Sequence, residues 1–105
     1  MTKEVYVFPR SPAAAEWLSA KYDDLRRVFL EVHRGNRIGV SLDHPHNLEV
    51  MSGESARWDP EEPPVYIYVP CHWNSEHLRT TEEDVRKVLR RLGASFDDFE
   101  IEASE

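Results

Sequence analysis

Two short runs of alternating apolar residues are the clearest strand signals in the chain. The run Val5–Phe8 combines β-branched and aromatic residues and stops at Pro9, and Val65–Val69 is bracketed by prolines. Such residues favour strands, and proline ends them. In the second run Tyr66 and Tyr68 face one side and the aliphatic residues the other, because strand side chains alternate. Both runs are predicted to be strands, with weaker strand signals at 48–51 and 96–101.

Two further segments repeat with the period of a helix. Ser11 followed by Pro12 places a cap residue before a proline in the first turn, which predicts a helix over 13–24. Thr80 and Glu83 have the spacing of a capping box, and an apolar stripe at 85, 88, 89 and 92 follows them. The second helix is therefore predicted to run from Thr80 to Gly93, which would end it.

The chain between 25 and 42 fits two structures. As a helix, it continues the apolar stripe of the preceding segment and ends at Gly35. As strands, it forms two period-2 segments around a Gly-Asn turn, which is typical of a hairpin. The helix would leave Leu30 exposed, whereas the hairpin would leave Phe29 exposed. Of the two, we expect the hairpin.

These elements predict an α+β fold in one domain that spans residues 1–105. The expected architecture is a single mostly antiparallel sheet of about five to six strands, with two helices packed on one face. If 25–35 is helical instead, the order becomes β-α-β-β-β-α-β, and a ferredoxin-like sandwich is a compatible alternative. A chain of 105 residues and 12.3 kDa is long enough for one core. Such a topology by itself carries no function.

Charge is distributed unevenly along the chain. The net charge is −7, yet residues 1–52 carry seven basic and seven acidic residues, and residues 53–105 carry six and thirteen. This acidic half argues against direct nucleic-acid binding. No apolar run is long enough to cross a bilayer, so no membrane partner is expected. A single cysteine excludes an intrachain disulfide and favours a reducing, cytoplasmic location.

One candidate for partner binding is the proline-rich loop at 53–63. It places Trp58 beside Asp59, Glu61 and Glu62. Tryptophan is enriched at interface hot spots, and acidic neighbours would steer the loop to a basic partner. The alternative is that Trp58 folds back and anchors the loop to the domain.

A second candidate is the acidic run near the C-terminal end of the chain. If this run is extended, Asp98, Glu100 and Glu102 lie on one face of a strand, with Asp97 just before them. Such a row of carboxylates could imitate a nucleic-acid backbone and occupy a basic groove. The alternative is an ordinary edge strand that charge keeps soluble.

Histidine and cysteine form two small groups that are candidates for metal ligation or nucleophilic chemistry. Zinc sites use such nitrogen and sulfur ligands, but the spacings here match no standard template, so no cofactor is expected. A cysteine nucleophile would also need a histidine base and a third orienting group, which the sequence does not indicate. The residues concerned are His44, His46, Cys71, His72 and His77.

The function expected from these observations is a non-enzymatic, acidic binding or inhibitor module that occupies a basic surface of a protein partner. In size and charge alone the chain is similar to phage-encoded inhibitors and to immunity proteins, and no motif identifies a family. One alternative is a small metal-binding or thiol enzyme or sensor, and another is a dimeric small-ligand regulatory domain. Either a monomer or a homodimer is compatible. The tyrosine face of 65–69 becomes an interaction surface if the helices do not cover it.

Overall fold

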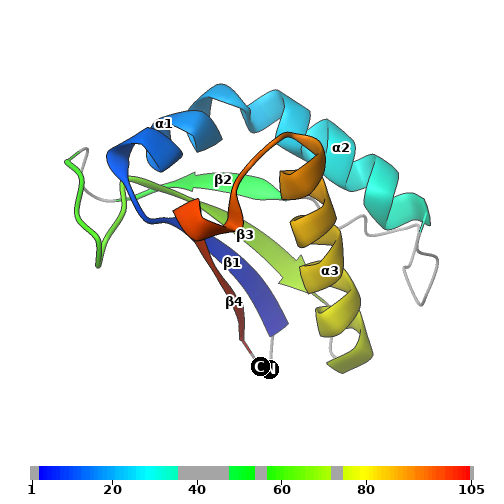
Figure 1. Cartoon of the computed structure of the whole chain (residues 1–105). Coiled ribbons are helices and arrows are strands. Elements are labelled where there is room, and N and C mark those ends of the chain that lie inside the picture. Colours follow the sequence, from blue (N-terminus) through cyan, green and yellow to red (C-terminus); the bar gives the residue numbers. More distant parts are fainter. Residues whose placement is uncertain (1–2, 36–47, 54–56, 72–74, 105) are drawn as a thin grey trace.

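The computed structural model describes residues 3–35, 48–53, 57–71 and 75–104. Within these residues the chain forms four strands, three α-helices and one short 3₁₀ turn (Figure 1). The elements are β1 (Lys3–Pro9), α1 (Pro12–Ala20), α2 (Tyr22–Gly35), β2 (Glu49–Ser52), β3 (Val65–Cys71), α3 (Ser75–Arg91), the turn η1 (Phe96–Asp98) and β4 (Phe99–Ser104).

The four strands form one antiparallel sheet in the order β2-β3-β1-β4. Strand β1 therefore lies inside the sheet, between β3 and β4. Strands β1 and β2 both run antiparallel to β3, so they run parallel to each other with β3 between them. By the same argument β3 and β4 run parallel on either side of β1. Each parallel pair is linked through helices, which gives two split β-α-β units.

All three helices cover the same face of the sheet (Figure 1). The core lies between these two layers, and its sheet side consists of the aliphatic residues that alternate along β1 and β3. Val5, Val7 and Ile67 are each fully buried there. On the helix side, Leu18, Leu25 and Leu89 are also fully buried. None of the described helices combines the length and apolar character that a membrane span requires.

The helix predicted over 13–24 is divided at Lys21. Ser11 caps the first part as expected, with its hydroxyl oxygen accepting from the N–H of Ala14 at 3.1 Å. At Lys21 the backbone leaves helical geometry (φ −99°, ψ 13°), and its N–H donates to the Trp17 carbonyl. The carbonyl of Lys21 then accepts from Leu25 at 2.8 Å, which starts α2 at once. The helix count is therefore three, whereas two were predicted.

The expected hairpin is wrong over residues 25–35, where the chain is the C-terminal part of α2. Leu25, Val28, Phe29 and Val32 are buried, and their spacing is that of one helical face. The hairpin had remained plausible because aliphatic residues at 28, 30 and 32 also alternate with period two. The helix is settled by tertiary packing, because α2 packs against α3 and these four residues belong to the hydrophobic core. The second predicted strand, at 38–42, lies outside the described residues.

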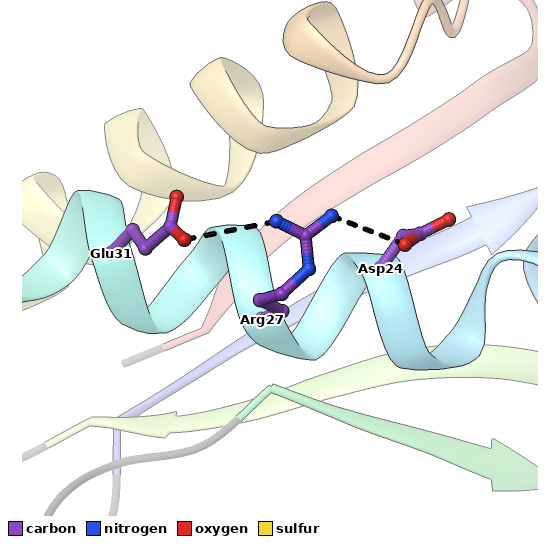
Figure 2. A network of polar contacts seen from close by, with 3 residues as sticks. All are labelled: Asp24, Arg27 and Glu31. Atoms are coloured by element: carbon purple, nitrogen blue, oxygen red, sulfur yellow. Dashed lines mark hydrogen bonds and ion pairs between the residues drawn. The ribbon is translucent and has the colours of Figure 1, made fainter.

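The solvent side of α2 carries an ion-pair network (Figure 2). The Arg27 guanidinium contacts Asp24 at 3.2 Å and Glu31 at 3.7 Å, which are the i−3 and i+4 neighbours. All three side chains are close to half exposed or more, so each ion pair contributes only about 0.3–0.5 kcal/mol to the stability of the helix. The network supports the helix, but the buried face determines it.

The α+β class and the antiparallel sheet are confirmed, while three details of the prediction are wrong. The described sheet has four strands and not five to six. Helix α3 begins at Ser75, so Thr80 lies inside it and does not cap it. The strand predicted over 96–101 starts only at Phe99, because the Ser95 hydroxyl accepts from the Asp97 N–H and holds η1 in front of it.

The helical assignment of 25–35 predicts unequal effects of two neighbouring substitutions. Phe29→Ala removes a fully buried side chain, so we expect the free energy of unfolding to fall by about 3–5 kcal/mol. Leu30→Ala removes a partly exposed one and should cost about 1 kcal/mol. Urea denaturation followed by circular dichroism measures both. A larger loss for Leu30→Ala than for Phe29→Ala would contradict the helix.

Candidate binding surface

The sheet has a second face, turned away from α1, α2 and α3, which we call the outer face. At its centre lie four half-buried aromatic residues, Tyr6 and Phe8 from β1 and Tyr66 and Tyr68 from β3. We call these four residues the aromatic patch. None of the described helices covers them, so the tyrosine side of β3 is not part of the core between sheet and helices.

The rings of the aromatic patch contact one another across both strands. Tyr6 and Phe8 stack almost in parallel, with centroids 5.6 Å apart and ring planes 9° apart. Tyr6 packs against Tyr68 at 5.5 Å and Phe8 against Tyr66 at 5.7 Å, both with tilted rings. These are the separations at which aromatic pairs attract beyond their burial. The patch is therefore a continuous, ordered surface.

Glutamates lie on both sides of the aromatic patch. The register joins Glu49, Tyr68, Tyr6 and Glu102 in one row across all four strands. In the next row the exposed Met51 pairs with Tyr66, and Phe8 pairs with Glu100. With Glu4, the outer-face positions of the described strands hold four glutamates and no lysine or arginine. The aromatic surface therefore lies in a negative field.

Glu4 holds the two central tyrosines in place. One of its carboxylate oxygens accepts a short hydrogen bond from the Tyr6 hydroxyl, and the other accepts from the Tyr68 hydroxyl at 3.3 Å. The hydrogen bond to Glu4 raises the pKa of Tyr6 to about 12, with smaller contributions from desolvation and from the nearby negative charge. Both phenols donate to the same carboxylate, which holds their rings in position.

Trp58 is partly buried and packs against the hydrophobic core. It forms one wall of a shallow groove with α1 and the start of β3, where Ala15 and Val65 lie. The base of its loop is closed where the Gly53 N–H donates to the Pro64 carbonyl at 2.8 Å. This packing corresponds to the alternative in which Trp58 anchors the loop. A role in partner binding stays a prediction.

The predicted acidic residues fall into two groups that the fold keeps apart. Asp59, Glu61 and Glu62 are exposed in the loop that ends at β3, and this loop lies away from β4 (Figure 1). Asp97 and Asp98 are exposed in η1, before the strand, so they do not extend the row of strand carboxylates. Only Glu100 and Glu102 lie exposed on the outer face, as the alternation predicted.

The histidine and cysteine candidates are not brought together by any described contact. His44, His46 and His72 lie outside the described residues. Cys71 is in β3 and His77 in the first turns of α3. Among the described residues no group of three or more histidine, cysteine or acidic side chains could hold a metal ion.

Sequence reasoning missed four residues of this surface, namely Glu4, Tyr6, Phe8 and Glu49. A signal was present, because Tyr6 and Phe8 alternate with two valines as the tyrosines of β3 alternate with their aliphatic neighbours. The pairing of β1 with β3 was not accessible, however, and it is this pairing that joins the two pairs of rings.

Comparison of the chain with protein-family models, with curated proteins and with solved structures found no match. The function is therefore argued from the geometry of the outer face.

The Glu4 contacts predict an unusual tyrosine titration. With a pKa of about 12 against the ordinary 10.0, Tyr6 should give a late ionisation step near pH 12 in an ultraviolet absorbance titration. Glu4→Gln removes the negative charge and should move this step back toward pH 10. Because folding raises the pKa of Tyr6, its hydrogen bond to Glu4 contributes fully to the free energy of unfolding below pH 10. That contribution is lost as the pH rises from 10 to 12. An unchanged Tyr6 step in the variant would contradict the assignment.

Proposed function

We propose that this protein is a non-enzymatic binding module that occupies a basic surface of a protein partner, with the outer face of the sheet as its main contact. The observation that carries the proposal is the aromatic patch with glutamates on both sides. A few residues carry most of the affinity at protein interfaces, and tyrosine is enriched among them. Surrounding carboxylates steer a basic partner toward them and disfavour acidic ones.

The negative charge of the outer face favours a protein partner over a nucleic acid. Aromatic residues on an open four-stranded sheet can stack unpaired bases. Such a surface needs lysine or arginine for the phosphates, but here the described strands place only glutamates around the rings. A protein partner rich in lysine or arginine fits both the rings and the charges.

The acidic loop is a second contact in this proposal. Its side chains at 59, 61 and 62 are exposed, so they add to the negative field that attracts the partner. Trp58 holds the loop against the domain and keeps these charges in position. Exposed charges of this kind act mainly on the association rate, whereas the aromatic patch determines how long the complex lasts.

The proposal extends to the fold type and setting. Two split β-α-β units in a sheet of order β2-β3-β1-β4 correspond to a ferredoxin-like sandwich. We place the protein in the cytoplasm, because a chain with a single cysteine forms no intrachain disulfide and cytoplasmic proteins rarely contain one. There it would act stoichiometrically, as an inhibitor of the immunity or anti-defence type does, by covering the partner's basic surface.

The test compares two variants that lose the same charge from different surfaces. The probe is a labelled twelve-residue peptide with three lysines and three arginines in random order, and anisotropy measures its binding. We expect Glu100→Gln/Glu102→Gln to weaken binding about fivefold to tenfold. The loop variant Glu61→Gln/Glu62→Gln should weaken it about twofold. For the unmodified protein, raising the salt from about 50 mM to about 500 mM should also weaken binding.

Equal losses in the two variants would show that only net charge matters and would contradict the outer face as main contact. Tighter binding of an oligothymidylate than of the basic peptide would overturn the proposed function itself. Thermal melts of each variant establish that the fold is intact.

A further inference from the structure

The outer face repeats one arrangement in two successive rows. Along β1 and β4 the register places Tyr6 opposite Glu102 and Phe8 opposite Glu100. We call these the two aromatic–carboxylate pairs. In each, a ring of the central strand lies next to an exposed carboxylate of the edge strand.

The distances within this arrangement follow from sheet geometry. Side chains directly opposite each other on antiparallel strands have Cβ atoms about 4.5–5.5 Å apart. Successive rows on one face are about 6.8 Å apart, because each strand residue advances about 3.4 Å. The two rings are 5.6 Å apart and nearly parallel, so the same ring orientation recurs in both pairs.

An arginine side chain satisfies both members of such a pair. Its guanidinium is planar and weakly hydrated, stacks on an aromatic ring and donates two parallel hydrogen bonds to a carboxylate. A lysine ammonium has the same charge, but it is compact and strongly hydrated and offers no flat surface. The combination of ring and carboxylate therefore favours arginine over lysine.

The repeat of the two pairs also sets the conformation of the ligand. An extended chain places every second side chain on one side at the same spacing of about 6.8 Å. Two arginines separated by one residue match the two pairs, whereas adjacent arginines of an extended chain point in opposite directions.

We propose that the outer face binds an extended segment of a partner protein with arginines at alternate positions, one arginine in each aromatic–carboxylate pair. This inference rests on the proposed function and specifies the chemistry of the partner. Glu4 supports the site indirectly, since its oxygens accept from Tyr6 and Tyr68 and hold the ring of the first pair in position.

A second copy of this chain does not fit the outer face. Two outer faces in contact would bring eight glutamates together, and the outer-face positions of the described strands hold no lysine or arginine to neutralise them. Like charges brought together at an interface that excludes water repel one another and are left without partners, which disfavours the association. The charge therefore selects a cationic partner over self-association.

The experiment uses three labelled peptides of equal charge in a serine–glycine background. The first carries two arginines at alternate positions, the second carries two adjacent arginines, and the third carries two lysines at alternate positions. Isothermal titration or anisotropy at low salt measures the affinity of the intact protein for each. We expect the alternate-arginine peptide to bind about fivefold tighter than either of the others.

Two variants test whether the aromatic–carboxylate pairs cause the preference for arginine. Phe8→Leu keeps the apolar bulk but removes one ring, and should reduce the arginine-to-lysine ratio to about twofold. Glu100→Gln/Glu102→Gln should weaken both alternate peptides about fivefold or more. As a matched control, Glu16→Gln/Glu83→Gln removes two exposed helix carboxylates and should change affinity less than about twofold.

The outcomes separate this inference from the proposed function. Equal affinity for the alternate-arginine and alternate-lysine peptides would overturn the arginine preference and leave a general basic-surface module standing. Equal affinity for alternate and adjacent arginines would overturn the extended register. Failure of every cationic peptide to bind the folded protein would overturn both proposals.

Discussion

The position of β1 between β3 and β4 is the constraint on which both faces of the sheet depend. Its residues alternate between two surfaces, with Val5 and Val7 fully buried under the helices and Tyr6 and Phe8 on the outer face. Hydrogen bonding to a strand on each side leaves this segment no freedom to shift in register. The valines that hold β1 in the core therefore also fix the rings of the candidate binding surface, which is rigid before any partner arrives.

The parts of the fold that could be predicted are those where one pattern has one interpretation. The alternation of residues 65–69 between prolines correctly predicted β3. The apolar stripe at 85, 88, 89 and 92 correctly predicted the body of α3. Residues 28–32 were ambiguous because aliphatic residues there satisfy helical and strand periods together. The full burial of Phe29 in the core, on a helix that packs against α3, decides for the helix, and this packing is tertiary. The first turns of α3 were missed because Thr80 and Glu83 imitate a helix start.

The candidate site was predictable only in part, because it is made by strands that are distant in the sequence. Alternation alone placed Glu100 and Glu102 on one face, and the structure agrees. It could not show that β1 lies beside β4, so the ring opposite each glutamate was unknown. Trp58 was predicted to bind a partner because it is a lone tryptophan in an acidic loop. A long loop without regular structure also needs an anchor, and Trp58 packs against the core. Local sequence thus indicated the two glutamates of β4 and the tyrosine side of β3, and not the rings of β1 that join them.

The order in which the strands leave the ribosome has a consequence for how this surface forms. Tyr6 is synthesised before its neighbours in the sheet, Tyr68 and Glu102, and β4 emerges last among the described strands. Until then β1 offers at least one unpaired strand edge together with apolar side chains, the kind of segment that chaperones bind and that aggregates if left alone. Completion of the sheet and formation of the aromatic–carboxylate pairs are therefore one event. A nascent chain stalled before Phe99 would carry the rings without their carboxylate partners.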